Sequence, residues 1–286
     1  MMNYNLEMLK RVQDDTKPHL THFTHAKRAA FTLAEVLITL AVIGIVAAMT
    51  IPTLISNYQE KQTISKLQKV YATLKNAFEM GKVQHGDYET WSWNQIPNEN
   101  AEKISYFWET YVFPHLKVTK KCFPVSNECV EPMYLLSGSS LSNTSSTRAA
   151  FILEDGTSVY TWASSGDFFP HIFVFADING KAKPNIVGKD IFVMYFSPQN
   201  PGNKLGSLDD DGNFIDSGKL MTNAYGLSFY GDMDGVTVED LMDSNFIVQN
   251  VNGTNNKMGC STGSLGYACG AAIKLNGWKF PDGYPE

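Results

Sequence analysis

One carboxylate inside a long apolar stretch constrains this chain more than any other feature. Residues 33–55 read LAEVLITLAVIGIVAAMTIPTLI, and Glu35 is the only charged residue among them. Because about 20 consecutive apolar residues allow an α-helix to cross a bilayer core, the stretch predicts a membrane-spanning helix. A charge within such a helix is costly, which makes Glu35 a candidate for function.

Basic residues set the expected orientation of this helix. Lys27 and Arg28 precede the apolar stretch, and no basic residue follows it until Lys61. Since cytoplasmic flanks carry an excess of Lys and Arg, we expect a cytoplasmic N-terminus and an extracytoplasmic remainder from about residue 56. A cleaved secretory signal fits less well, because its apolar region spans only about 7–15 residues. A plain signal anchor fits the length but leaves Glu35 without a partner.

The residues around this stretch resemble the N-terminus of type IV pilins and type II secretion pseudopilins. That family carries a basic leader, a small residue before a cleavage site, Phe after it, Glu at the fifth mature position and Pro at the twenty-second. Here Ala30 precedes Phe31, and counting from Phe31 makes Glu35 the fifth residue and Pro52 the twenty-second. Ala30 stands where Gly is usual, and the 30-residue leader is longer than in many members.

The resemblance implies a sequence of processing and assembly steps. A prepilin peptidase would cut between Ala30 and Phe31, and the new α-amine of Phe31 would be methylated. An inner-membrane assembly platform would then move the subunit from membrane lipid into a filament of other pilin or pseudopilin subunits. There the amine is expected to meet Glu35 of a neighbouring subunit, an ion pair that favours the correct register. Pro52 removes a backbone donor and is expected either to kink the helix or to be tolerated within it.

The pattern after Pro52 predicts a pilin-like α+β fold. Apolar residues recur every three or four positions, which is typical of an amphipathic helix that continues to about residue 82. They are Ile64, Leu67, Tyr71, Leu74 and Phe78. A coiled coil or the chain's own β-sheet could cover this stripe, and the β-type composition downstream favours the sheet. We therefore expect a leader at 1–30, a membrane and filament-core helix at 31–55, its amphipathic continuation at 56–84, and an extracytoplasmic β-rich head at 85–286.

Short antiparallel strands joined by long loops are predicted for the head. The patterning predicts a hairpin of residues 149–153 and 158–162, followed by strands at 171–176 and 191–196. Residues 106–113 fit either a short helix or an aromatic strand, and residues 137–147 read as a polar loop. We expect Trp91, Trp93 and Trp108 to lie in the core rather than on a ligand-binding surface.

Four cysteines fall in the predicted extracytoplasmic head: Cys122, Cys129, Cys260 and Cys269. None forms a C-x-x-C pair, and an even count in an oxidising compartment indicates two disulfides. Three pairings are open. Sequence proximity favours Cys122 with Cys129 and Cys260 with Cys269, and buried reduced cysteines are the alternative.

Size and charge narrow the role within this family. Without a 30-residue leader of five basic and three acidic residues, 256 residues remain, with a net charge near −8 instead of −6. The large head favours a minor pilin or pseudopilin, and the acidic balance argues against a nucleic-acid partner. A pilus-tip adhesin or a DNA-uptake pilin would share the same stalk, and pilus and secretion subunits share the same N-terminus.

Residues 176–192, ADINGKAKPNIVGKDIF, resemble a segment found in many bacterial prepilin-type proteins. Oxygen ligands from Asp177, Asn179 and Asp190 could bind Ca²⁺. The same residues also suit a turn, in which Asp and Asn cap backbone groups. The turn is favoured, so we expect no cofactor, with calcium as the alternative. The acidic stretches at 209–213 and 232–235 lack the Glu of an EF-hand frame and are expected to be turns as well.

A signal-anchored extracytoplasmic enzyme is the alternative from another class. The motifs H-E-x-x-H, G-x-x-x-x-G-K-[ST] and G-x-G-x-x-G are absent, but residues 259–263, GCSTG, match the G-x-S-x-G nucleophile elbow. That elbow needs a buried strand before Ser261 and a helix after it, whereas both flanks here are polar or Gly-rich. A loop tied by Cys260 fits better, and we expect a structural subunit without catalytic residues.

Overall fold

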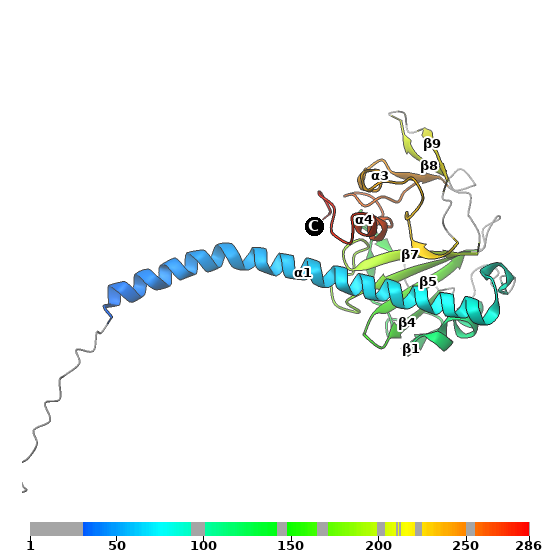
Figure 1. Cartoon of the computed structure of the whole chain (residues 1–286), viewed down its shortest axis with the longest axis horizontal. Helices are drawn as coiled ribbons and strands as arrows, with labels where there is room; N and C mark the ends of the chain where they lie inside the picture. Colours follow the sequence, from blue (N-terminus) through cyan, green and yellow to red (C-terminus); the bar gives the residue numbers. More distant parts are fainter. Residues whose placement is uncertain are drawn as a thin grey trace, which may run out of the picture. The chain divides into compact units, whose positions relative to one another are not determined.

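The computed structural model of the chain (Figure 1) describes residues 31–92, 101–141, 148–164, 171–198, 204–209, 211, 213–220, 225–249 and 255–285. The chain divides into two compact units, Met1–Leu54 and Ile55–Glu286. The long helix α1 (Leu33–His85) begins in the first unit and ends in the second. The leader predicted at residues 1–30, including Ala30, lies outside the described residues.

The first half of α1 is an apolar helix whose side chains are uncovered. All of its large apolar side chains between Leu33 and Ile55 are exposed. The helix continues through Pro52 without ending there. Among the described residues, α1 is the one helix that is long and apolar enough to cross a membrane, by length and composition.

The second half of α1 is amphipathic and packs on the chain's own sheet. Its buried positions recur at helical spacing and are Leu67, Val70, Tyr71, Leu74, Ala77, Phe78 and Gly81. The Tyr71 ring stacks on Phe229 at a centroid distance of 4.5 Å, and the Phe78 ring lies 4.2 Å from that of Phe196. Burying one such side chain contributes about 1.5–3 kcal/mol. The predicted stripe is therefore confirmed, and the chain's own sheet covers it, joined at Phe78 by α2 (Ala101–Phe107) and the π-helical turn after it.

A six-stranded antiparallel sheet forms the centre of the second unit (Figure 1). Its strand order is β1-β4-β5-β6-β7-β10. The strands are β1 (Val118–Cys122), β4 (Ala149–Leu153), β5 (Ser158–Ser164), β6 (His171–Asp177), β7 (Ile191–Ser197) and β10 (Gly226–Phe229). Every residue of β7 is buried, so this inner strand is covered on both faces. The predicted hairpin and the two strands after it are confirmed, and with them the α+β class.

The segment that fitted either a helix or a strand is helical. A 3₁₀ turn, η1 (Tyr88–Thr90), follows α1, and α2 (Ala101–Phe107) then runs into a π-helical turn, η3 (Trp108–Val112), and a 3₁₀ turn, η4 (Phe113–His115). Trp91 and Trp108 are buried among aromatic rings, as expected. Trp93 lies outside the described residues.

Smaller elements surround the main sheet. A four-stranded sheet has the order β12-β11-β8-β9. It contains β8 (Lys204–Leu208), β9 (Phe214–Leu220), β11 (Ile247–Gln249) and β12 (Asn255–Lys257). Two short helices flank these strands in the chain: α3 (Val238–Met242) lies between β10 and β11, and α4 (Cys269–Leu275) follows β12. The expectation of a loop throughout 137–147 was wrong, because β3 (Ser140–Leu141) pairs with β2 (Met133–Tyr134) and so satisfies backbone groups that a loop would leave to water.

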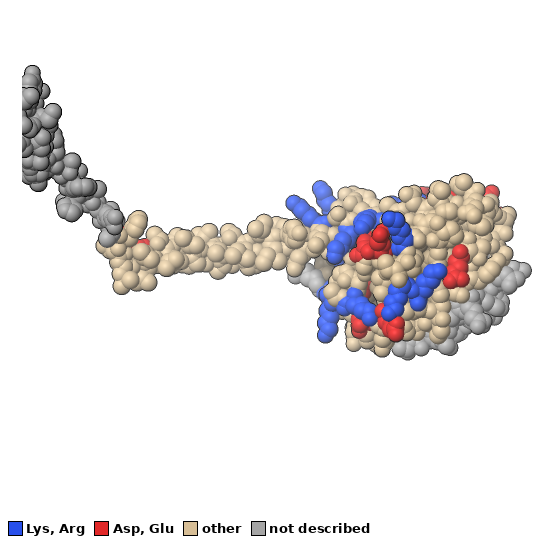
Figure 2. Space-filling model, turned by 90° about the horizontal axis from the view of Figure 1, so that it is seen from below, with Lys and Arg blue, Asp and Glu red and all other residues tan. Residues whose placement is uncertain are grey.

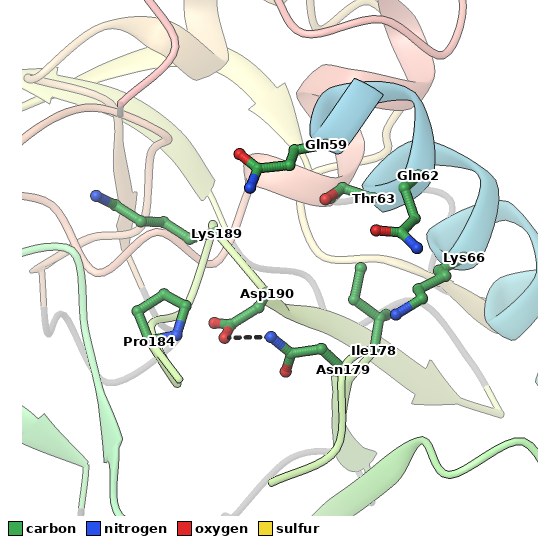
Figure 3. A pocket seen from close by; sticks show the side chains of 9 residues that line it. All are labelled: Gln59, Gln62, Thr63, Lys66, Ile178, Asn179, Pro184, Lys189 and Asp190. Atoms are coloured by element: carbon green, nitrogen blue, oxygen red, sulfur yellow. Dashed lines mark hydrogen bonds between the residues drawn. The ribbon is translucent and has the colours of Figure 1, made fainter. Parts of the chain in front are cut away.

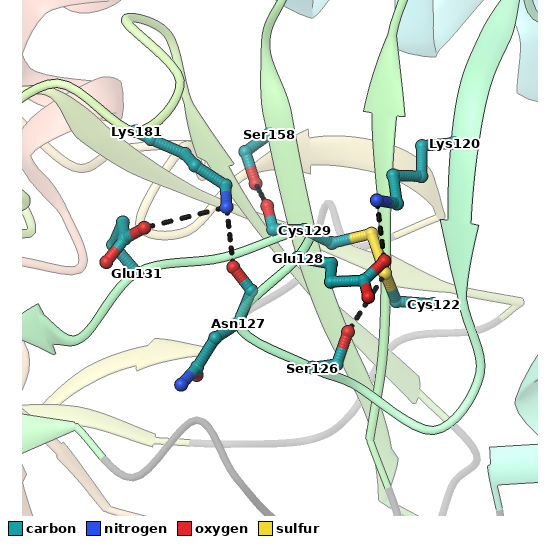
Figure 4. Close-up of polar contacts among 9 residues, drawn as sticks. All are labelled: Lys120, Cys122, Ser126, Asn127, Glu128, Cys129, Glu131, Ser158 and Lys181. Atoms are coloured by element: carbon teal, nitrogen blue, oxygen red, sulfur yellow. Dashed lines mark hydrogen bonds and ion pairs between the residues drawn. A yellow bond between two sulfur atoms is a disulfide. The ribbon is translucent and has the colours of Figure 1, made fainter.

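Both disulfides join cysteines that are close in sequence. Cys122 is bonded to Cys129 and Cys260 to Cys269, the pairs that sequence proximity favours. Figure 4 shows the first disulfide within a set of polar contacts. Lys120 pairs with Glu128 at 2.6 Å, and Ser158 donates a hydrogen bond to the Cys129 carbonyl. The loop between the two cysteines is thus tied to β1 and to β5.

Candidate functional site

Glu35 is hydrogen-bonded to its own chain at the start of α1. The Thr32 backbone N–H and hydroxyl donate to Glu35 Oε2 at 2.8 and 2.9 Å. In return, the Glu35 backbone N–H donates to Thr32 Oγ1 at 3.2 Å. This reciprocal pair is a capping box, which satisfies two backbone donors at the helix start. The T-x-x-E spacing signals such a box in the sequence, although Thr32 was not among the predicted site residues.

The loop between β6 and β7 brings together the three residues predicted as calcium ligands. Asp190 Oδ2 accepts hydrogen bonds from the Asn185 backbone N–H at 2.8 Å and from Asn179 Nδ2 at 3.1 Å. Asp190 Oδ1 accepts from the Ile186 backbone N–H at 2.7 Å. Asp177 Oδ1 accepts from the Asn179 backbone N–H at 3.2 Å. Both carboxylates therefore shape the backbone of the loop.

Burial makes these two carboxylates hold their protons more tightly than usual. Asp177 and Asp190 are 7% and 5% exposed. Burial, together with the neighbouring charge of Asp190, raises the pKa of Asp177 to about 8. Burial also raises the pKa of Asp190, against the opposing effect of its backbone hydrogen bonds. Asn179 Oδ1 and Asn185 Oδ1 are buried and accept no hydrogen bond from the described residues.

The described part of the chain offers no other candidate for a metal site. In the part of the chain that the structure describes, three or more His, Cys, Asp or Glu side chains nowhere gather as a metal site would require. The loop offers two carboxylates and two amide oxygens instead. Such a set can retain a proton or accept a cationic group.

Neighbouring elements hold the loop from several sides. The Tyr134 backbone N–H donates to the Asn185 carbonyl at 2.9 Å, and the Val187 N–H donates back to the Tyr134 carbonyl at 2.8 Å. The Tyr284 hydroxyl, near the end of the chain, donates to the Gly188 carbonyl. Gly188 has a φ of +90°, and a Cβ there would lie 2.7 Å from Cys269 Sγ. The loop is therefore held in one conformation by the rest of the second unit.

A polar cavity of about 300 Å³ separates this loop from α1 (Figure 3). One wall consists of side chains of α1 and the other of side chains of the β6–β7 loop. The lining residues are Gln59, Gln62, Thr63, Lys66, Ile178, Asn179, Pro184, Lys189 and Asp190. Among them, only Asn179 and Asp190 were predicted from the sequence as site residues.

The surface of the head carries both signs of charge. On the face drawn in Figure 2, Lys and Arg side chains lie beside Asp and Glu side chains. Ion pairs in the second unit include Lys69 with Asp155, Lys117 with Glu154, Lys120 with Glu128, Lys121 with Glu109 and Lys181 with Glu131. Pairs as exposed as these contribute little to stability, because solvent screens them.

The remaining candidate motifs lie in turns. Asp209 Oδ1 accepts from the backbone N–H groups of Asp211 and Asn213, in the connection between β8 and β9. Asp232 forms an ion pair with Lys274 of α4. Ser261 follows the short strand β12 by four residues, and α4 begins only eight residues later. These described residues therefore do not form the strand–Ser–helix turn of a nucleophile elbow.

Comparisons with known proteins give two matches along the chain. Residues 25–51 match the prokaryotic N-terminal methylation motif. Residues 53–213, more than half of the 286 residues, match a family of unknown function, DUF6613. No curated protein and no solved structure matches the chain.

The first match covers the residues that led to the resemblance with pilins. It extends from just before Lys27 through Glu35 to the residue before Pro52. The predicted prepilin-type signal is therefore confirmed. Together with α1, it fits a protein anchored in the inner membrane. The chain belongs to the DUF6613 family, and its N-terminal signal is that of a type IV pilin-like or pseudopilin-type protein.

Proposed function

We propose that the chain is a minor subunit of a type IV pilus or a type II secretion filament. The observation that carries the proposal is the methylation motif at residues 25–51, which continues into an uncovered apolar helix with one carboxylate. A helix of this kind needs either lipid or apolar helices of other subunits around it. Membrane storage followed by filament assembly provides both environments in turn.

The partners and the segments follow from this proposal. Residues 1–30 act as the leader, and prepilin peptidase cuts between Ala30 and Phe31. Residues 31–55 then serve first as a membrane anchor and later as filament core, while the inner-membrane assembly platform transfers the subunit. The head lies outside the cytoplasm, and its two disulfides suit an oxidising compartment.

We propose that Glu35 pairs with a neighbouring subunit during assembly. Both Thr32 donors bond to Oε2, and no hydrogen bond from a described residue reaches Oε1. The carboxylate therefore retains capacity for the Phe31 amine of a neighbouring subunit. We expect Glu35→Ala to be cleaved normally and to be strongly depleted from sheared filaments, measured by quantitative immunoblotting. Glu60→Ala, on the same helix, is the control and should assemble normally.

Two outcomes would contradict an assembly role for Glu35. If Glu35→Ala enters filaments as well as the unaltered chain does, Glu35 has no assembly role. If Glu35→Ala also remains uncleaved, the substitution acts on processing, and the assignment to assembly is wrong.

We also propose that the β6–β7 loop is a structural turn that works without calcium. The support is that both oxygens of Asp190 already accept hydrogen bonds from the loop itself. Thermal unfolding of the full chain should then give the same midpoint with added CaCl₂ and with excess chelator. A midpoint that rises with calcium and falls again with chelator would show a calcium site formed by Asp177, Asn179 and Asp190.

A further inference from the structure

We propose that the cavity between α1 and the β6–β7 loop binds a zwitterionic phospholipid headgroup that carries a phosphodiester and a primary ammonium group. The inference rests on the membrane stage of the proposed function and is independent of filament assembly. We call this cavity the headgroup pocket.

The headgroup pocket presents both signs of charge within one small volume. Lys66 lines it from α1, and Lys189 and Asp190 line it from the β6–β7 loop. A purely anionic ligand would meet Asp190, and a purely cationic ligand would meet the two lysines. A ligand with a phosphate and an ammonium group a few atoms apart avoids both conflicts.

Neutral hydrogen-bonding groups complete the lining. Gln59, Gln62 and Thr63 face the loop from successive turns of α1 (Figure 3). Amide and hydroxyl groups both donate and accept, so they can bond phosphate oxygens as well as ammonium hydrogens. The cavity of about 300 Å³ is at the lower end of the size range of small-molecule sites. Its size and polarity suit a headgroup and not an acyl chain.

One wall of the headgroup pocket is fixed before any ligand arrives. Asp190 holds the loop through Asn185 and Ile186, and Tyr284 holds it through Gly188. A preformed wall lowers the entropy cost of binding. This rigidity favours a specific site over a chance hollow between a helix and a mobile loop.

The place of the pocket along α1 favours a lipid as its ligand. Gln59 follows Ile55, the last residue of the apolar stretch, by four residues, which is about 6 Å of α-helix. Headgroup layers extend about 5–8 Å beyond each side of the hydrocarbon core. With the apolar stretch in the core, the pocket begins on α1 at the depth where headgroups lie.

The test uses the full chain in nanodiscs made of phosphatidylcholine with phosphatidylethanolamine or phosphatidylglycerol as guest lipid. Native mass spectrometry then counts the lipids that stay bound after release from the disc. We expect phosphatidylethanolamine to be retained about tenfold over phosphatidylcholine, because methylation of the ammonium removes its hydrogen bonds. Lys66→Gln should abolish this preference. Lys61→Gln, which changes an exposed lysine of α1 outside the pocket, should preserve it.

Several results would overturn the proposal. Equal retention of all three lipids would show that the pocket does not select a headgroup. Equal loss with Lys61→Gln and Lys66→Gln would reduce the effect to general attraction by positive charge. Retention of phosphatidylglycerol as strongly as phosphatidylethanolamine would remove the role of the ammonium group.

A second experiment, with water-soluble ligands, distinguishes a headgroup site from a general phosphate site. Glycerophosphoethanolamine should shift the NMR signals of Lys66 and Thr63 in the detergent-solubilised chain, whereas inorganic phosphate at the same concentration should not. Equal shifts with both compounds would contradict the proposal. Because this arm requires neither cleavage at Phe31 nor filaments, failure of the pocket and failure of the proposed function remain distinguishable.

Discussion

Thr32 determines how Glu35 is held while the chain is alone. The capping box at the start of α1 uses the backbone and the hydroxyl of Thr32, so the carboxylate does not stand without hydrogen bonds. The Thr32 hydroxyl takes part in two of these three hydrogen bonds, which gives Thr32 a positioning role. Replacement of that hydroxyl tests the role with little change in side-chain volume.

We predict that Thr32→Val frays the first turn of α1. Amide hydrogen exchange of residues 33–36 in micelles should accelerate about fivefold, the factor that corresponds to loss of one N-cap. Thr39→Val is the matched control, because the Thr39 hydroxyl bonds only the Val36 carbonyl within the same turn. Unchanged exchange in Thr32→Val would mean that the box does not hold the helix start in solution.

Asp177 gives the second unit a pH dependence of unusual sign. Its pKa is raised by burial and by Asp190 to about 8 in the folded chain, from 3.8 for the free group. Between these values the folded state keeps a proton that the unfolded state releases, so the stability falls as pH rises from about 4 to about 8. We predict that Asp177→Asn reduces this decline, as measured by urea unfolding at pH 5 and pH 8, and that Asp190, whose pKa burial also raises, accounts for what remains.

Asp155 provides the control for that experiment. Although burial acts in the other direction, hydrogen bonds from Lys69 and Thr157 hold the pKa of Asp155 below its usual range. Its contribution to stability is therefore present above pH 4 and is lost only in stronger acid. Asp155→Asn should leave the difference between pH 5 and pH 8 unchanged. If Asp177→Asn also leaves it unchanged, Asp177 is not the source of the pH dependence.

At the scale of elements, α1 joins the sheet through a few large side chains. Phe78 is fully buried between α2, the η3 turn and β7, with its ring near those of Phe107, Trp108 and Phe196. Removing it leaves a cavity in an aromatic cluster that the surrounding rings cannot easily fill. The cost should therefore exceed the simple transfer energy of the side chain.

We predict that Phe78→Ala lowers the free energy of unfolding of the second unit by about 3–5 kcal/mol. Met80→Ala is the control, because Met80 is 51% exposed two residues further along α1 and should change it by no more than about 0.5 kcal/mol. Denaturant titration of the full chain followed by tryptophan fluorescence measures both variants. Equal effects would show that the amphipathic half of α1 does not depend on the sheet for its stability.

The sequence predicted those elements whose patterning is strong and local. The hairpin of β4 and β5 carries apolar runs on both sides of a Glu-Asp-Gly turn, and the stripe of α1 repeats over several turns. The four-stranded sheet was not predicted. Its strands are three to seven residues long and most of them mix polar with apolar residues. β8 and β12 are joined only through β11, which begins 39 residues after the end of β8. Such strands depend on long-range pairing that local propensity does not encode.

Only the β6–β7 loop of the candidate site, and not the α1 wall of the cavity, was predictable from the sequence. The spacing of Asp177, Asn179 and Asp190 within one loop indicated that they lie together, and the structure brings them into hydrogen-bond distance. Gln59 and Lys66, on the opposite wall, lie more than a hundred residues earlier in the chain. A single sequence carries no signal for that juxtaposition.

In the whole molecule, the two units differ in whether the chain itself buries their apolar side chains. Ile55–Glu286 buries its own core and contains both disulfides, whereas the helical part of Met1–Leu54 exposes its apolar side chains. The first unit therefore needs surroundings that the chain itself does not supply. A prepilin-type signal at the same end indicates which surroundings these are, first lipid and then other subunits.

The mass of the mature chain tests this account most directly. Protein extracted from membranes of the native host would be analysed by intact and N-terminal peptide mass spectrometry. A chain processed as a prepilin should begin at Phe31 with a methylated α-amine and carry two disulfides. A mature N-terminus at any other residue, or an unmodified amine at Phe31 in filament-associated protein, would contradict it.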